Sequence, residues 1–242
     1  MGKPVIRAHL ATFPPRRRIL RKVVDAILPQ VDHLFVVLND YDEVPGYLAK
    51  DERVTAVIPD RDVKDAGKFW FAPEPDDIVF TIDDDIGYPA DYVARTIAQA
   101  EALGWEGNVF GYQGNSWTRP EGWSNHLFFE ALDHVKGYSV IGTGTLCAKG
   151  AAIAPLAEIE PLAGACDIAY GRWIRSRDIL PWGLPRAANW LAKALPQNLR
   201  ASSLFATVHR KNLPENLEVF RSFAFDWPHA NLSYDAYRRP AV

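Results

Sequence analysis

Three consecutive carboxylates are the residues of this chain best placed to do chemistry. Asp83, Asp84 and Asp85 directly follow the apolar run 78–82, and the chain turns soon afterwards. Adjacent carboxylates repel one another and partial burial raises the cost of each charge, so a divalent cation would stabilise the arrangement. If the strand continues through the triplet, Asp83 and Asp85 point one way and Asp84 the other. A solvated acidic turn is the alternative interpretation, because short acidic motifs often occur without a metal.

The elements before and after the triplet alternate between strand and helix patterns. We expect strands at 5–11, 33–38, 54–58, 77–83 and 109–112, and helices opening at Pro14-Pro15 and at Pro89 and ending near Pro29 and Gly104. Such alternation predicts an α/β fold with a mainly parallel sheet. After about residue 113 tryptophan, glycine and proline crowd the chain, and we expect this half to shape a pocket and not the sheet. The end, 234–242, is expected to fray.

Composition sets broad limits on the class of protein. With 242 residues, 48% hydrophobic and 24% charged, the chain can bury one sizeable core. A formal net charge of -3 argues against general nucleic-acid binding. No apolar stretch has the length of a membrane span and the N-terminus lacks the apolar core of a signal peptide, so we expect a cytoplasmic protein. Cys147 and Cys166 lack CxxC spacing and are predicted to be buried thiols.

Ligands of open α/β sheets bind outside the carboxyl ends of the strands. Besides the triplet, the residues there are 12–16, 39–40 and 65–68. Their polar groups, a cation for phosphate and a metal site would together suit a nucleoside diphosphate. Lys68 could neutralise a phosphate oxygen while Gly67 lets the backbone come close, although a solvated surface lysine is the alternative. Neither a GxxxxGK[ST] loop nor a dinucleotide glycine fingerprint is present, which disfavours P-loop and nicotinamide enzymes.

Several segments, in sequence order, resemble the nucleotide-sugar-dependent glycosyltransferases of the GT-A fold, close to the inverting family two of bacterial surface-polysaccharide synthesis. The segments are Leu28-Pro29-Gln30-Val31-Asp32, Leu38-Asn39-Asp40-Tyr41-Asp42, Gly67-Lys68-Phe69, the DxD-like Phe80 to Pro89, and Gly142-Thr143-Gly144-Thr145. The resemblance covers roughly residues 5 to 175. It implies a Rossmann-like GT-A single domain over 1–242 with helices on both faces of the sheet. Residues 1–112 would form its nucleotide-binding half and 113–233 its acceptor half.

The resemblance also implies roles for individual residues. Asp85 would be the direct ligand of Mn²⁺ or Mg²⁺, and Asp83 and Asp84 would hold the ribose or reach the metal through water. The remaining donor-binding positions would be Asp40 for the base, Thr12 and Pro14 lining the base pocket, Lys68 near the diphosphate, and Gly142, Thr143 and Gly144 near the sugar or acceptor. From position alone, Arg16 is near enough to a strand end to meet a nucleotide, and His209 is a further candidate metal ligand.

The general base is the least certain position of the resemblance. Family two uses an aspartate, often in a Glu-Asp pair, and Asp167 in the segment 166–170 is the best match, without the preceding glutamate. The alternative role for Asp167 is a helix N-cap, since a helix can follow to Arg177. Asp133 and then Glu130 are the reserve candidates.

The implied reaction moves a sugar from a nucleoside-diphosphate sugar, foremost a UDP-sugar, to a hydroxyl of a saccharide or glycoconjugate, with inversion. The alternatives are a sugar nucleotidyltransferase, a catalytically inactive nucleotide-sugar-binding module, and a glycoside hydrolase, whose facing carboxylates the triplet does not supply. Trp117 and Trp123 could line an acceptor groove. The segment 185–200 could form a helix on a membrane surface, giving peripheral membrane contact, or dock on its own domain.

Overall fold

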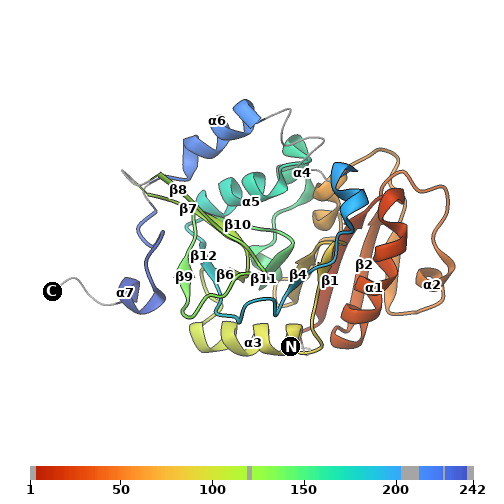
Figure 1. Ribbon diagram of the computed structural model, residues 1–242, viewed down its shortest axis with the longest axis horizontal. Coiled ribbons are helices and arrows are strands. Elements are labelled where there is room, and N and C mark those ends of the chain that lie inside the picture. Colours follow the sequence, from red (N-terminus) through yellow and green to blue (C-terminus); the bar gives the residue numbers. More distant parts are fainter. Residues whose placement is uncertain (1–3, 119–121, 203–212, 226, 239–242) are drawn as a thin grey trace.

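A mixed sheet forms the centre of the protein, in a computed structural model that describes residues 4–118, 122–202, 213–225 and 227–238 (Figure 1). Its strands lie in the order β3-β2-β1-β4-β11-β6-β12-β9. The first four run parallel, β11 is antiparallel to both its neighbours, β12 is parallel to β6, and β9 is antiparallel to β12. The bounds are β1 (Ile6–Thr12), β2 (His33–Leu38), β3 (Val54–Val57), β4 (Ile78–Ile82), β6 (Asn108–Gly111), β9 (Lys136–Gly137), β11 (Thr145–Lys149) and β12 (Leu180–Gly183).

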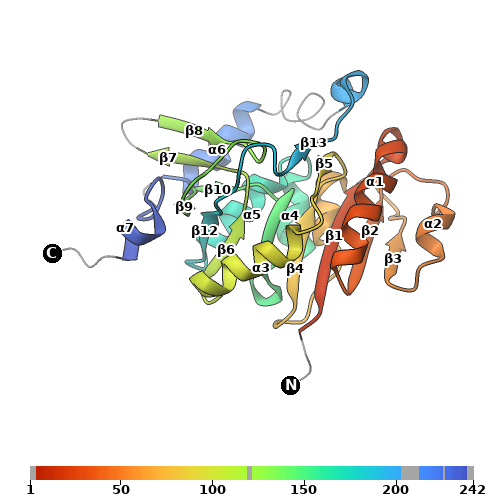
Figure 2. The same ribbon diagram turned by 60° about the horizontal axis from the view of Figure 1, so that its bottom comes forward.

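Helices cover both faces of this sheet, as predicted (Figures 1 and 2). Strand side chains alternate between faces. Phe80 and Ile82 therefore belong to the core beneath α1 (Arg17–Ile27), α2 (Gly46–Ala49) and α3 (Tyr92–Leu103). Val79 belongs to a second core, beneath a 3-10 helix (Lys64–Phe69), α4 (Leu156–Ile159) and α5 (Cys166–Arg175). The result is a three-layer α/β domain.

The first half of the chain folds much as its pattern predicts. α1 buries Ile19, Leu20, Val23, Val24 and Ile27, which recur at helical spacing on one face. Each such side chain contributes roughly 1.5–3 kcal/mol when fully buried. A 3-10 turn (Pro14–Arg16) precedes α1, and another (Leu28–Gln30) follows it near the predicted stop. All five residues of β4 are buried, in keeping with a strand covered on both faces.

The second half corrects one expectation, because β11, β12 and β9 belong to the central sheet. β11 lies between β4 and β6, with Thr145 opposite Ile82 and Lys149 opposite Ile78. An antiparallel strand needs no crossover helix, so it breaks the strand–helix rhythm on which the prediction depended. The remainder forms a small sheet of β7 (Gly114–Thr118), β8 (Gly122–His126) and β10 (Val140–Ile141), against which α6 (Leu213–Phe223) packs.

Two further expectations were wrong. Tyr234–Arg238 form the helix α7, and the Tyr234 hydroxyl donates a 2.6 Å hydrogen bond to the carbonyl of Leu103; residues 239–242 lie outside the described part. No helix occupies 185–196. There β13 (Ala192–Lys193) pairs with β5 (Ile86–Gly87), and Leu191 is fully buried. The segment thus docks on its own domain. Among the described residues no helix is both long and apolar enough to cross a membrane.

Candidate functional site

The carboxyl ends of β1 and β4 flank the point where the strand order reverses. From β1 the chain builds β2 and β3 on one side, and then returns to place β4 on the other side. Such a switch point is where open α/β sheets form a ligand crevice. Thr12 is the last residue of β1, and Asp83 follows the last residue of β4. The antiparallel β11 starts at the same edge, so the Gly142–Gly144 turn before it also reaches this point.

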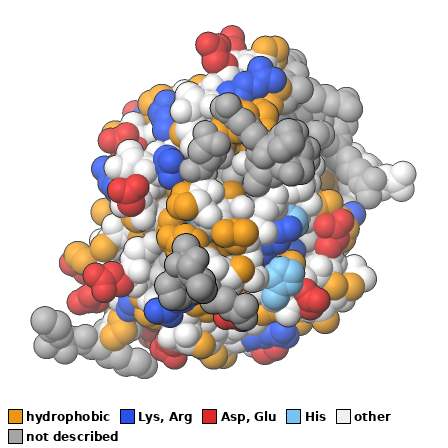
Figure 3. Space-filling model, turned by 90° about the vertical axis from the view of Figure 1, so that its left-hand side faces the viewer, with side chains coloured by type: hydrophobic (Ala, Val, Ile, Leu, Met, Phe, Trp, Pro, Cys, Tyr) orange, Lys and Arg blue, Asp and Glu red, His pale blue; other side chains and the backbone are white. Residues whose placement is uncertain are grey.

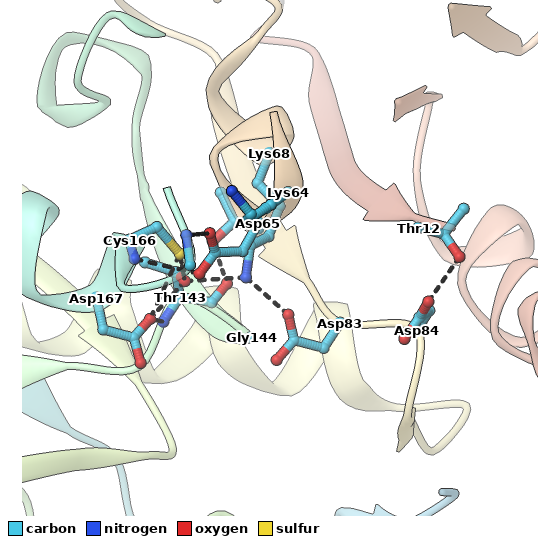
Figure 4. A network of polar contacts seen from close by, with 12 residues as sticks. Thr12, Lys64, Asp65, Lys68, Asp83, Asp84, Thr143, Gly144, Cys166 and Asp167 are labelled. Atoms are coloured by element: carbon cyan, nitrogen blue, oxygen red, sulfur yellow. Dashed lines mark hydrogen bonds and ion pairs between the residues drawn. The ribbon is translucent and has the colours of Figure 1, made fainter. Parts of the chain in front are cut away.

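The three aspartates lie in the turn beyond β4 and not in the strand itself. Asp83 points toward Lys68, and Asp84 points the other way, accepting a 2.6 Å hydrogen bond from the Thr12 hydroxyl (Figure 4). Asp85 lies 3.4 Å (Oδ2) from Nη1 of Arg16, and Asp84 lies 4.0 Å (Oδ1) from Nε of the same side chain. Asp85 thus shares its cationic partner with Asp84, because strand alternation stops when β4 ends at Ile82.

The triplet has a strong affinity for positive charge. Burial raises the pKa of Asp84 to about 7, and the Asp85 charge raises it further against the Thr12 hydrogen bond and Arg16. Burial and the Asp83 charge raise the pKa of Asp85 to about 6, opposed by Arg16 and Lys68. Arg16 is 3% exposed, and its Nε and Nη1 atoms have no hydrogen-bond partner in the described structure. One guanidinium therefore only partly offsets two buried carboxylates.

The donor chemistry of the triplet fits a hard divalent cation. Asp85 and Asp83 offer carboxylate oxygens, the ligands that Mg²⁺ and Mn²⁺ prefer. In the described residues no group of three or more His, Cys, Asp or Glu side chains could hold a metal by itself. Cations bound through one or two carboxylates complete their shell with water and substrate phosphates, so the site suits that mode. His209 lies outside the described residues.

Lys68 is a buried bridge and not a solvated lysine. Its side chain is 3% exposed, and Nζ donates 2.7 Å to Oδ1 of Asp83 and 2.9 Å to Oγ1 of Thr143. Burial alone would lower the pKa of Lys68, but the Asp83 charge and those of Cys166, Asp167 and Asp65 raise it well above its usual value. The ammonium group is charged and committed to Asp83, which leaves it less free to neutralise a phosphate than the sequence suggested.

Gly67 lets this bridge reach the sheet. A β-carbon on Gly67 would lie 2.9 Å from Cγ1 of Val37 and 3.1 Å from Cβ of Ala11. The 3-10 helix that carries Lys68 therefore packs directly onto β1 and β2. The glycine serves this packing, and a close backbone approach to phosphate is not needed to explain it.

Thr143 joins the bridge to Asp167. Its backbone N–H and its hydroxyl both donate to Oδ1 of Asp167, at 2.8 Å and 2.6 Å. Asp167 is the second residue of α5, and the residue before the helix, Ala165, makes no side-chain cap. Asp167 therefore does not fill the N-cap position. Burial raises the pKa of Asp167, while Lys68 and Thr143 oppose the rise.

Other predicted positions stay apart from this chain of contacts. Pro14 and Asp40 are exposed, and within the described part of the chain no hydrogen bond or ion pair joins them to the triplet. Asp40 has a φ of 56°, and its neighbour Asn39 holds the loop by accepting from Val63 N at 3.0 Å. Gly142 only donates its backbone N–H to the carbonyl of Gln113.

The reserve bases lie near the far edge of the sheet. Asp133 precedes β9, which is four strands from β4, so roughly 19 Å separates the two strands. Its side chain is 93% exposed and pairs with His134 at 2.5 Å, and Glu130 is exposed as well. This side of the molecule carries histidine side chains beside lysine or arginine and acidic groups (Figure 3). Asp133 and Glu130 are thus surface residues there.

Trp117, proposed for an acceptor groove, packs instead within the small sheet. Its ring stacks on Phe220 of α6 at 5.0 Å and contacts Phe225 at 4.2 Å. The side chain of Trp123 lies outside the described part. The contacts of Trp117 are those of a structural core residue.

Two important residues were not singled out from the sequence. Tyr88 is 6% exposed; its hydroxyl accepts from the N–H of Asp83 at 2.9 Å and donates to the carbonyl of Gly144 at 2.6 Å. Asp65 accepts from Gly164 N at 2.5 Å and from Cys166 N at 3.2 Å, which fixes the start of α5. Their signal was position only: Asp65 lies among the residues after a strand, and Tyr88 lies in the DxD-like segment.

Protein-family models and curated protein sequences give no match to this chain. The site is therefore interpreted from its own geometry and from the resemblance of its motifs.

Proposed function

We propose that the protein is a metal-dependent glycosyltransferase of the GT-A type. It would transfer a sugar from a nucleoside-diphosphate sugar, foremost a UDP-sugar, to a hydroxyl of a saccharide or glycoconjugate acceptor, with inversion. The main support is the hydrogen-bonded path Asp83–Lys68–Thr143–Asp167, which joins a cation-seeking acid cluster to a separate, partly exposed carboxylate. A cytoplasmic location, with peripheral contact at the inner face of a membrane, belongs to this proposal.

The roles divide between the two ends of that path. Mn²⁺ or Mg²⁺, held by Asp85 with Asp83, would stabilise the charge that develops on the leaving diphosphate. Asp167 would take the proton of the acceptor hydroxyl as it attacks. Thr12 and Arg16 hold and partly neutralise Asp84, so that the triplet keeps one geometry while its charge awaits the ligand.

A sugar nucleotidyltransferase is the runner-up, and the loop after β1 disfavours it. Such an enzyme is expected to carry a glycine- and basic-rich loop there, but the loop reads Thr12-Phe13-Pro14-Pro15. Its first basic side chain, Arg16, is buried against the aspartates and not extended toward a triphosphate.

The decisive experiment measures binding and turnover separately. Calorimetry with UDP and a panel of UDP-sugars, with and without Mn²⁺, should show metal-dependent binding, and slow release of UDP should follow without added acceptor. Asp167→Asn should leave donor binding within about twofold and lower turnover by about 10²- to 10⁴-fold. Asp133→Asn, an exposed aspartate remote from β4, is the matched control and should behave as wild type.

Two results would overturn the proposal. One is the absence of binding by any nucleotide or nucleotide sugar in either metal condition. The other is formation of a nucleoside triphosphate from the sugar donor and pyrophosphate, which would identify the nucleotidyltransferase. Full donor binding with no turnover of any acceptor would instead favour the binding module.

A further inference from the structure

We infer that Thr143 and Lys68 are positioning residues that hold Asp167 with its Oδ2 atom as the single proton-accepting oxygen. The inference deepens the proposed function and rests on it for its meaning in catalysis. The geometry that carries it is independent of any donor or acceptor.

The direction of every proton at Thr143 is fixed by its neighbours. Lys68 carries only donors, so Nζ must donate to Oγ1 of Thr143 across their 2.9 Å contact. Cys166 lies 3.0 Å (Sγ) from the same Oγ1, and burial raises its thiol pKa well above the usual value, so it also acts as a donor. With both lone pairs of Oγ1 engaged, its own proton is directed to Oδ1 of Asp167 at 2.6 Å.

The two oxygens of Asp167 are consequently unequal. Oδ1 receives the hydroxyl and the backbone N–H of Thr143, and the Cys166 thiol lies 3.8 Å from it. In the described structure Oδ2 receives no hydrogen bond, and Figure 4 shows it turned away from the network. Asp167 is partly exposed, so Oδ2 is the oxygen to which a substrate hydroxyl can deliver a proton.

Both partners in this contact are held in place from behind. The carbonyl of Thr143 accepts a 2.5 Å hydrogen bond from the hydroxyl of Thr81 on β4. Asp65 accepts the N–H groups of Gly164 and Cys166, which fixes the first turn of α5 and with it Asp167. The rotamer of Asp167 is therefore set by the sheet on one side and by the 3-10 helix on the other, as a preorganised base requires.

The test separates positioning from folding. Thr143→Val keeps the shape of the side chain but removes its hydroxyl, and Thr143→Ser restores the hydroxyl. Thr96→Val is the matched control, because Thr96 is also fully buried and hydrogen-bonded through Oγ1, on α3. Thr143→Val should lower kcat at least tenfold while KM for the donor stays within twofold, and Thr143→Ser should recover most of kcat.

A measurement that needs no turnover completes the test. The side-chain carboxyl carbon of Asp167, assigned by its loss in Asp167→Asn, is titrated by NMR in the nucleotide-free protein. Removing a hydrogen bond to the ionised form raises the proton affinity, so the titration midpoint should rise in Thr143→Val and return in Thr143→Ser. The other groups that face Asp167, namely Lys68, Cys166, Asp83 and Asp65, are the same in all variants.

The outcomes are distinct. An unchanged midpoint and an unchanged kcat in folded Thr143→Val would overturn the inference while leaving the glycosyltransferase intact. A shifted midpoint in a wild-type protein that binds no nucleotide would overturn the function and keep the positioning. If Thr143→Val does not fold, Thr143→Ala and Thr143→Ser provide the same comparison, and equal midpoints in those two variants would overturn the inference.

Discussion

Gly144 lies directly against the carboxylate of Asp83. A β-carbon on Gly144 would lie 2.1 Å from Oδ2 and 2.6 Å from Cγ of Asp83, distances that no real contact tolerates. The other oxygen of Asp83 is held by Lys68 at 2.7 Å, so the side chain lies between the glycine and the ammonium group. The glycine in the Gly142–Gly144 turn is thus required by the first acid of the triplet.

Gly144→Ala should displace Asp83 and weaken its bond to Lys68. We expect a loss of about 1–3 kcal/mol in the free energy of unfolding, measured in urea, together with weaker Mn²⁺ binding. Gly46→Ala is the control, because nothing lies within 4 Å of the β-carbon it would add and Gly46 begins α2. Equal stability of the two variants would contradict the close approach seen here.

Removal of the Lys68 charge should be among the most damaging single changes. Lys68→Met leaves Asp83 without its ammonium partner and Thr143 without its donor. Breaking a buried pair by removing one partner costs about 3–5 kcal/mol. Thermal and urea unfolding measure the loss, and Lys50→Met, at an exposed lysine beyond α2, should change stability by less than about 0.5 kcal/mol. A small effect at Lys68 would mean that the bridge is not formed in solution.

Arg16 should compete with a divalent cation for the triplet. Its guanidinium lies 3.4 Å from Asp85 and 4.0 Å from Asp84 without a well-formed hydrogen bond. Arg16→Gln removes a positive charge next to the cation position, so Mn²⁺ alone should bind several-fold more tightly by calorimetry. Arg17→Gln is the adjacent control, since the side chain of Arg17 is 57% exposed and pairs with Glu43 on the surface. Weaker Mn²⁺ binding in Arg16→Gln would show that Arg16 helps to organise the site.

Asp84 should make stability fall with rising pH. Its pKa is raised from 3.8 to about 7 by burial, so between these values the folded state binds more protons than the unfolded state. Its stabilising contribution is complete below pH 3.8, and it is lost as the pH rises toward 7. The full shift corresponds to an effect on the order of 4 kcal/mol.

The comparison of wild type with Asp84→Asn isolates this contribution. Burial lowers the pKa of His9 to about 3 and of His126 and His229 to about 4, so these residues add stability as the pH rises from about 4 to 6.5. Their effect is common to both proteins. Urea unfolding from pH 4 to 8 should therefore show wild type losing stability relative to Asp84→Asn, and a constant difference would argue against a protonated Asp84.

The sequence was sufficient for the parts of the fold that repeat a local pattern. β2 was predicted at its observed bounds, 33–38, and the apolar periodicity of α1 gave its buried face. β11 could not be found that way, because the short segment Thr145–Lys149 owes its burial to β4 and β6 and not to its own periodicity. The 185–200 segment was misjudged for a similar reason: its apolar residues serve a β5 pairing and a buried contact, not a helix.

The candidate site shows the same division. Asp83, Lys68 and Asp167 were found from residue type and position. Thr143 was expected near a sugar or acceptor, but its role as the link depends on a hydrogen bond to Lys68 across 75 positions, which no local spacing reveals. The Tyr88 contact with Gly144 spans 56 positions and was equally invisible.

The place of β11 in the sheet bears on how the protein folds. β4 pairs with β1 on one edge and with β11 on the other, and β11 comes more than 60 residues later in the chain. A chain ending at residue 112 would hold all three aspartates yet expose the apolar strand Ile78–Ile82 as an open edge, which invites pairing with other chains. Residues 1–112 are therefore not an autonomous folding unit, and the acid cluster matures only when the second half of the chain closes that edge.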